Sequence, residues 1–204
     1  MLNKNHKISI YNITLLAIPM LLYLFFGIFD GAVWCADTAS YVEMHSSREP
    51  LYPMYLAMLR TLFDANIVYR DLPLYLFVAA LGQSVLAGIA AWSISRYLTK
   101  VLSLPRFMGY IIIIMPIATS LLCRFAAKRS SMYSNSILTE GIVISLFLIF
   151  IRFCTEYVFE NTRKSYIWCI ILCIIGISTR KQMYIMLFLF LISCIYPDCK
   201  KINR

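Results

Sequence analysis

The sequence contains few charged residues, and acidic residues are the scarcest of them. Only 14% of the 204 residues are charged, with 10 Asp and Glu against 19 Lys and Arg. A soluble domain has roughly 25% charged and ~45–50% apolar residues. Here 61% are apolar, and the mean hydropathy is +0.74. This composition excludes an ordinary soluble domain and indicates that lipid surrounds most of the protein.

Signatures of several common enzyme classes are also missing. The chain has no Walker phosphate-binding loop, no His-Glu-x-x-His and no Gly-x-Ser-x-Gly. No polar linker, low-complexity tract or convincing repeat interrupts it. Cys169 and Cys173 lie one helical turn apart with no His nearby, so zinc-ligand spacing is absent. We expect only Cys35 to lie outside the membrane, and therefore no disulfide within this chain.

Six apolar segments are candidate membrane spans. A spanning helix needs about 20 mostly apolar residues, and it must be helical because lipid offers an open strand no hydrogen-bond partners. The segments comprise residues 8–29, 72–95, 107–123, 130–151, 165–179 and 182–197. The last two are short. We therefore predict an all-α fold, a polytopic transmembrane helix bundle of about six spans, with residues 1–204 forming a single integral membrane domain.

The distribution of Lys and Arg predicts the orientation. Lys4 and Lys7 precede a first span that is too long for a cleaved signal peptide, so it is expected to be a retained anchor. With a cytoplasmic N-terminus, eleven bases lie on the inner side and eight on the outer side. Bases beside the spans are attracted to anionic lipid head groups. The net charge of +9 thus predicts membrane lipids as partners in a plasma-membrane protein, and no nucleic acid.

The first outer loop, residues 30–71, holds more than half of the acids. They are Asp30, Asp37, Glu43, Glu49, Asp64 and Asp71, against three bases, Arg48, Arg60 and Arg70. Asp37 precedes a plausible helix, and prolines at 50 and 53 separate it from a second helix over roughly 53–63. The second helix is apolar nearly all round, which predicts that it lies in the membrane interface. We expect it to hold Asp37 close to the membrane surface.

Each charged candidate in this loop has two interpretations. Asp37 is either a helix N-cap, a role that contributes about 1 kcal/mol, or a functional carboxylate. Arg48 and Glu49 are either a solvated pair of little energetic consequence or part of a site. His45 is expected to have no role. The number of carboxylates in one loop, with bases on other outer segments to match them, favours a site.

Two later segments supply candidate partners, and residues 124–129 add three further bases. Glu140 lies near the outer end of the fourth predicted span, where an acid either faces a polar cavity or pairs with an Arg. Arg180 and Lys181 follow a span whose fifteen residues rise only ~23 Å. They are either interfacial anchors or a phosphate site, in which Arg supplies a planar fork and Lys a point charge.

These motifs resemble membrane glycosyltransferases of the GT-C fold, including protein O-mannosyltransferases and lipid A aminoarabinose transferases. The resemblance rests on the outer-loop Asp37 followed by Arg-Glu-Pro-Leu-Tyr-Pro at 48–53. Leu-Thr-Glu at 138–140 is similar to the acid-bearing start of a later span. Ser-Thr-Arg-Lys-Gln at 178–182 is similar to the family's Arg-Pro-x segment, with Lys181 where Pro is usual. Family members run to several hundred residues, so this chain is expected to match their N-terminal module.

The resemblance implies transfer of a sugar from a polyprenyl-phosphate donor to an acceptor at the outer membrane face, with inversion. It implies Asp37 as the catalytic base and Arg48, Arg180 and Lys181 as phosphate ligands. Glu49 and Glu140 are expected to orient the acceptor or the cations. No cofactor is predicted. Some relatives use a divalent metal, but no second acid lies within two residues of Asp37.

Other classes remain open. A non-enzymatic membrane protein, such as a lipid or oligosaccharide transporter or an accessory subunit, is the main alternative. A transporter more often shows internal repeats and helices broken at the midplane, and neither is evident here. A polysaccharide polymerase would share a lipid-linked substrate but not the motif of the first loop.

Overall fold

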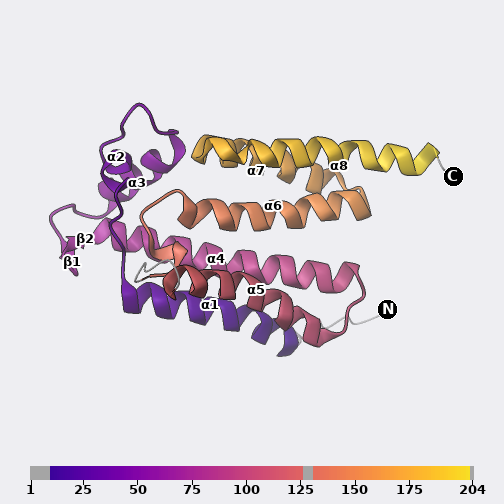
Figure 1. The fold of residues 1–204 in the computed structure, drawn as a ribbon, viewed down its shortest axis with the longest axis horizontal. Helices are drawn as coiled ribbons and strands as arrows, with labels where there is room; N and C mark the ends of the chain where they lie inside the picture. Colours follow the sequence, from indigo (N-terminus) through magenta and orange to yellow (C-terminus); the bar gives the residue numbers. More distant parts are fainter. Residues whose placement is uncertain (1–9, 126–130, 203–204) are drawn as a thin grey trace, which may run out of the picture.

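The computed structural model describes residues 10–125 and 131–202, and most of them are helical (Figure 1). In chain order the elements are α1 (Ile10–Asp30), α2 (Thr38–Val42), α3 (Leu51–Leu62), β1 (Val68–Tyr69), β2 (Leu72–Pro73), α4 (Leu74–Val101), α5 (Arg106–Phe125), the 3-10 turn η1 (Tyr133–Asn135), α6 (Glu140–Glu160), α7 (Arg163–Thr179), the 3-10 turn η2 (Lys181–Met183) and α8 (Tyr184–Ile202). The predicted all-helical character is confirmed. The two strands pair antiparallel and are only two residues long.

Within residues 10–125 and 131–202, four helices are long and apolar enough to cross a membrane: α1, α4, α5 and α6. The predicted segments 165–179 and 182–197 do fall in helices, α7 and α8. Helix α7 has 17 residues, and the apolar helical stretch Lys181–Ile195, which comprises η2 and the first part of α8, is shorter. The structure thus supports a membrane-embedded protein with four helices of spanning length, whereas the count of six is not confirmed.

Helix α4 lies at the centre of the bundle and contacts α1, α3, α5 and α6. Its buried face is rich in small residues, which let neighbouring backbones approach closely. At Gly88, for example, an added Cβ would lie only 3.0 Å from the Met20 Cα on α1. On the other side, α6 contacts α7 and α8. The helices therefore form a layered stack, with α4 and α6 in its middle (Figure 1).

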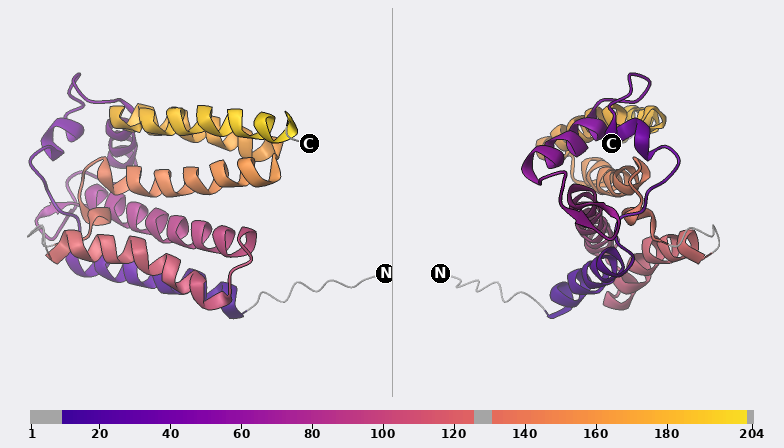
Figure 2. Two further views of the ribbon diagram at one scale, coloured as in Figure 1. Left: turned by 45° about the vertical axis from the view of Figure 1, so that its right-hand side comes forward. Right: turned by 90° about the vertical axis from the view of Figure 1, so that its left-hand side faces the viewer.

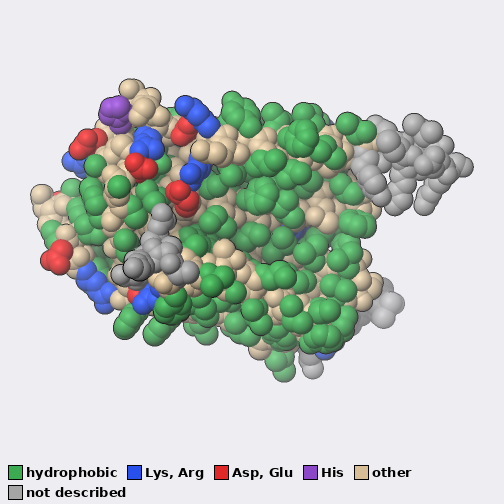
Figure 3. All heavy atoms as spheres, in the orientation of Figure 1, with side chains coloured by type: hydrophobic (Ala, Val, Ile, Leu, Met, Phe, Trp, Pro, Cys, Tyr) green, Lys and Arg blue, Asp and Glu red, His purple; other side chains and the backbone are tan. Residues whose placement is uncertain are grey.

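The polar segments gather at one end of this stack. Helices α2 and α3 and the β1–β2 hairpin lie across the ends of the long helices (Figures 1 and 2). In the face shown in Figure 3, charged side chains cluster at the same end, while the helix flanks are almost entirely apolar. The hairpin turns at Arg70 and Asp71, both at positive φ (51° and 64°), as a two-residue type I′ turn requires.

The start predicted for the fourth span is wrong, and helices α4 and α6 also extend six and nine residues beyond the predicted ends at 95 and 151. The span expected over 130–151 begins only at Glu140, and the described residues before it form an irregular segment around η1. Its buried polar side chains include Ser131, Ser134, Asn135, Ser136 and Thr139. Ser and Asn compete with the helical backbone for hydrogen bonds, and Asn135 finds its partners in other segments. The Asn135 amide nitrogen donates to the Phe26 carbonyl at 2.9 Å, and the Val33 N–H donates to the Asn135 carbonyl at 2.9 Å.

A glutamine on α4 anchors this irregular segment. The Tyr52 hydroxyl donates to the Gln83 amide oxygen at 2.9 Å, while the amide nitrogen donates to the carbonyls of Ser134 (3.0 Å) and Ser136 (3.1 Å). Burial raises the pKa of the Tyr52 phenol far above its ordinary value, so it remains a neutral donor. Gly141 passes directly over this amide, and a Cβ there would overlap it. The contacts fix where α6 begins, and hence the position of Glu140.

Candidate functional site

All six site residues selected from the sequence line one pocket of about 170 Å³. They come from three separate segments. Asp37, Arg48 and Glu49 belong to the loop around α2, Glu140 begins α6, and Arg180 and Lys181 lie at the junction of α7 and η2. Tyr41, Ser47 and Gln182 complete the lining. We call this site the Asp37 pocket.

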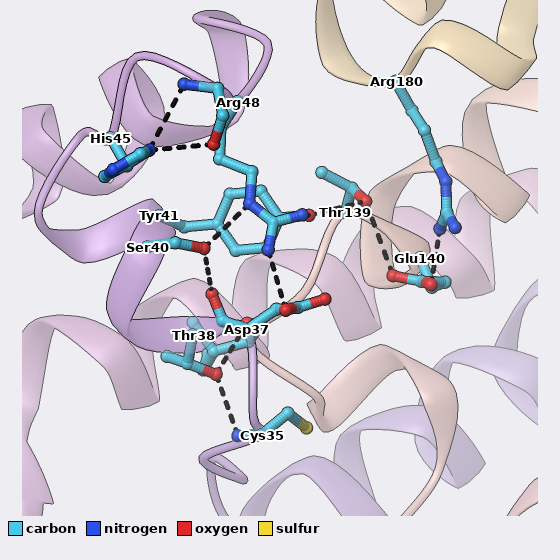
Figure 4. Close-up of polar contacts among 12 residues, drawn as sticks. Cys35, Asp37, Thr38, Ser40, Tyr41, His45, Arg48, Thr139, Glu140 and Arg180 are labelled. Carbon is cyan, nitrogen blue, oxygen red and sulfur yellow. Dashed lines mark hydrogen bonds and ion pairs between the residues drawn. The ribbon is translucent and has the colours of Figure 1, made fainter.

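Arg48 is the best-anchored cation of the Asp37 pocket (Figure 4). Its Nη2 lies 2.7 Å from Asp37 Oδ1, and its Nε donates to Ser40 Oγ at 2.8 Å. The guanidinium also lies over the Tyr41 ring, 4.7 Å from the ring centroid. The Arg48 side chain is 27% exposed, whereas that of Asp37 is 58% exposed. Asp37 therefore offers an accessible carboxylate whose direction is set by a well-held guanidinium.

The alternative interpretation of Asp37 as an N-cap is wrong. Asp37 precedes α2, but its side chain makes no capping hydrogen bond. Thr38 instead fixes the start of the helix. Its Oγ1 accepts from the Cys35 N–H at 2.8 Å and donates to the Ile137 carbonyl at 3.0 Å. The Asp37 carboxylate is therefore free of backbone contacts and is paired with Arg48.

Glu140 and Arg180 form the second ion pair of the pocket (Figure 4). Arg180 Nη1 lies 2.5 Å from Glu140 Oε1, and Arg180 Nε donates to Gln182 Oε1 at 2.9 Å. Both side chains are about one-third exposed. Glu140 is the first residue of α6, where the helix dipole favours a negative charge. The two interpretations of Glu140 are thus compatible, because it lines a polar pocket and also pairs with an Arg.

Glu49 and Lys181 form the third and weakest pair. Lys181 Nζ lies 3.6 Å from Glu49 Oε1, and the Lys181 side chain is 77% exposed. An exposed pair of this kind contributes little to stability, about 0–1 kcal/mol. The interpretation of Arg48 and Glu49 as a pair with each other is wrong. Arg48 pairs with Asp37 and Glu49 pairs with Lys181, and both partners lie farther away in the sequence.

Tyr41 and Thr139 connect the first two pairs, and the sequence analysis missed both. Arg48 Nη1 donates to the Tyr41 hydroxyl at 3.5 Å, which lies 3.5 Å from Thr139 Oγ1. Thr139 in turn donates to Glu140 Oε2 at 3.4 Å. Tyr41 could have been found, since it follows Asp37 by four residues and shares its helix face. Gln182 lies in the Ser-Thr-Arg-Lys-Gln segment quoted above, but no sequence signal indicates that it or Ser47 lines a pocket.

Other charged residues are kept apart from the Asp37 pocket. Glu43, Asp64 and Asp71 are exposed and do not line it. Asp30 pairs with Arg124, with side chains only 5% and 18% exposed. Lys128 and Arg129, which the sequence analysis counted among the outer bases, lie outside the described residues. Within the described part of the chain, no three His, Cys, Asp or Glu side chains meet as metal ligands.

The lining of the Asp37 pocket carries three cations and three carboxylates, so its formal charge is balanced. Its volume lies below the ~300–1,000 Å³ of pockets that enclose a drug-sized ligand. It is therefore suited to one small polar group, such as a phosphate, while the remainder of a larger ligand lies outside it. The guanidiniums can donate to an anion, and the carboxylates can accept from hydroxyl or amino groups.

No protein-family model, curated protein or solved structure matches this chain. The geometry of the Asp37 pocket and the motifs within it are therefore the basis for inferring a function.

Proposed function

We propose that the Asp37 pocket binds the phosphate of a polyprenyl-phosphate sugar donor and transfers the sugar to an acceptor at the outer face of the plasma membrane. One observation carries the proposal. Two guanidiniums from distant segments, Arg48 and Arg180, enter a single pocket, each beside a carboxylate. A planar guanidinium matches a phosphate through two parallel hydrogen bonds. The resemblance to GT-C transferases supports the same substrate class.

The transfer step uses both kinds of group. The acceptor oxygen or nitrogen forms a bond to the anomeric carbon of the sugar, and the bond from that carbon to the phosphate oxygen breaks. The electron pair of the broken bond goes to the phosphate, whose charge Arg48 and Arg180 stabilise. The acceptor proton goes to the Asp37 carboxylate as general base. Attack opposite the leaving group inverts the anomeric centre.

The membrane setting makes such a donor accessible. In this proposal the N-terminus is cytoplasmic, α7 and α8 complete a set of six spans, and α3 lies in the outer interface. Support comes from the exposed apolar side chains of α3, including Met54, Met58 and Leu62. The lipid tail of the donor then remains in the bilayer, while its phosphate reaches the Asp37 pocket at head-group height.

The balanced charge of the pocket favours a second candidate, a non-enzymatic accessory protein. Each cation already has a carboxylate within 4 Å, at 2.7, 2.5 and 3.6 Å. In that case the pairs serve only to hold the loop, α6 and α7 together. The two candidates differ in whether the guanidiniums are needed for donor binding.

Donor binding by the full protein in nanodiscs tests the proposal. We expect Arg48→Ala and Arg180→Ala each to weaken binding of a short-chain polyprenyl phosphate by roughly 10- to 150-fold, the loss of a hydrogen bond to a charged group. Lys at either position should restore binding only in part, because an ammonium cannot reproduce the bidentate contact. The probe is the lipid phosphate itself, so binding is measured without turnover.

Arg60→Ala is the matched control, since Arg60 is exposed at the end of α3 and lies outside the pocket. It should bind the lipid phosphate as the parent does. Parental affinity in both Arg48→Ala and Arg180→Ala would refute the proposal. Impaired binding in these variants, with no sugar transfer by the parent protein from any donor tested, would instead establish an accessory binding role.

A further inference from the structure

A second pocket, of about 370 Å³, lies between the C-terminal halves of α4 and α6. Its lining residues are Trp92, Ser93, Arg96, Tyr97, Lys100, Arg152, Glu156 and Glu160. We call it the Arg96 pocket. The space-filling view is indented at this end of the molecule, between the ends of the long helices (Figure 3). None of its residues takes part in the Asp37 pocket.

The two pockets lie near opposite ends of α6. Glu140, in the Asp37 pocket, is the first residue of α6, whereas Glu156 and Glu160 belong to its last turns. Sixteen residues of helix rise about 24 Å, close to the ~30 Å thickness of a bilayer core. The Arg96 pocket therefore opens at the membrane surface opposite to the Asp37 pocket. Trp92 and Tyr97 are the kind of aromatic residue that collects at such surfaces.

The Arg96 pocket contains one exposed cation without an ion-pair partner among the described residues and one shielded N–H donor without an acceptor. The Arg96 guanidinium lies over the Trp92 ring, 5.4 Å from its centroid, and no carboxylate of the described residues pairs with it. The indole Nε1 of Trp92 is shielded from solvent and has no hydrogen-bond partner in the described part of the chain. A shielded N–H without an acceptor costs roughly 1–3 kcal/mol. A ligand that supplies acceptor oxygens would satisfy both groups.

The carboxylates of the Arg96 pocket are already occupied. Arg152 Nη2 lies 2.8 Å from Glu156 Oε2, and Lys100 Nζ lies 3.8 Å from Glu160 Oε1. The lining carries three cations and two carboxylates, so Arg96 holds the uncompensated charge. This balance differs from that of the Asp37 pocket and favours an anionic ligand.

We propose that the Arg96 pocket binds a phosphate group, supplied by a phospholipid of the adjoining leaflet. The phosphate oxygens accept from the Arg96 guanidinium and from Trp92 Nε1, and the volume lies at the lower end of the ~300–1,000 Å³ typical of ligand pockets. Free phosphate shares this chemistry and is the other possible source. The inference does not depend on the function proposed for the Asp37 pocket.

Calorimetric titration of the detergent-solubilised full protein tests this inference. One arm uses dihexanoyl phosphatidylglycerol, and the other uses inorganic phosphate. We expect Arg96→Gln to weaken lipid binding by roughly 10- to 150-fold and Trp92→Phe, which removes the N–H donor but keeps an aromatic ring, by roughly 2- to 13-fold. Tighter binding of the lipid than of inorganic phosphate assigns the source to the membrane, whereas equal affinity assigns it to soluble phosphate.

Arg106→Gln is the matched control, because Arg106 is an exposed cation at the start of α5 and lies outside the Arg96 pocket. It should bind the lipid as the parent does. The inference is overturned if Arg96→Gln and Trp92→Phe bind phosphatidylglycerol as tightly as the parent. It is equally overturned if Arg106→Gln weakens binding as much as Arg96→Gln, because the attraction is then a general effect of surface charge.

Discussion

Replacement of Asp37 by Asn separates the catalytic role of this residue from any structural one. The substitution keeps the size of the side chain and removes its charge and basicity. Asp37 makes no capping hydrogen bond to α2, so the principal structural contact at risk is the 2.7 Å ion pair with Arg48. The effect on stability and the effect on sugar transfer can therefore be estimated separately.

The structure predicts a small effect on stability and a large one on transfer. The Asp37 side chain is 58% exposed and that of Arg48 is 27% exposed, and solvent-exposed pairs contribute about 0–1 kcal/mol. Arg48 also keeps its hydrogen bond to Ser40 and its contact with the Tyr41 ring. A positioned general base typically contributes ~100- to 10,000-fold to the rate. We thus expect Asp37→Asn to unfold close to the parental temperature and to lose transfer by that factor.

The assay measures release of polyprenyl phosphate from polyprenyl-phosphate-linked sugars by membranes containing the full protein. Thermal unfolding and binding of the lipid phosphate are measured on the same preparations. Glu43→Gln is the control, since Glu43 is an exposed carboxylate of the same loop outside the pocket. Near-parental release by Asp37→Asn, with normal expression and unfolding, would refute Asp37 as the base and direct the search to Glu49 or Glu140.

Three further predictions concern stability and topology. Gly141→Ala should destabilise the protein by about 1–3 kcal/mol, read as a lower unfolding temperature, because its Cβ displaces a buried hydrogen-bonded amide. Asp30→Ala leaves the half-buried Arg124 unpaired and should cost up to about 3 kcal/mol, the lower end of the penalty for a fully buried charge. The double variant that also carries Arg124→Ala should recover part of this loss, and additive effects would contradict the reasoning. In a cysteine-free background, Ser47→Cys should react with an impermeant thiol reagent from outside. Leu102→Cys should not, because Leu102 is also exposed but follows the C-terminal end of α4, away from the Asp37 pocket. Outside labelling of position 102 would overturn the orientation.

The sequence predicted which segments are helical better than it predicted where the helices begin and end. Uncharged runs of sufficient length indicated α1, α4 and α5 directly, because burial in lipid depends mainly on composition. The same criterion placed the start of α6 too early, since Ser and Asn carry no charge and do not interrupt an apolar run. Their hydrogen bonds to Gln83 and to the chain near Val33 depend on tertiary contacts, which a single segment does not reveal.

The sequence predicted which charged residues line the Asp37 pocket better than it predicted which of them form ion pairs. Charges are rare in this chain, so each one at the polar end was a candidate. The pairing of Arg48 with Asp37 depends on the turn after α2, where Met44 takes a positive φ of 54° and the chain reverses. Neither composition nor spacing indicates that turn. The Arg96 pocket was missed because its charges fall at helix ends, where lipid head groups were a sufficient explanation.

The ion pairs of the Asp37 pocket also bear on how the chain enters the membrane. Glu49 and Glu140 are synthesised before Arg180 and Lys181, and domains fold progressively as the chain emerges. In the orientation proposed above, the α7–η2 junction must carry two cations to the outer side, against the usual retention of bases in the cytoplasm. Glu49 and Glu140, which are inserted first, provide counter-ions when these two cations cross the membrane. The carboxylates of the acidic first loop would then attract Arg180 and Lys181 as the α7–α8 hairpin inserts. Insertion of the hairpin and completion of the Asp37 pocket would be one event.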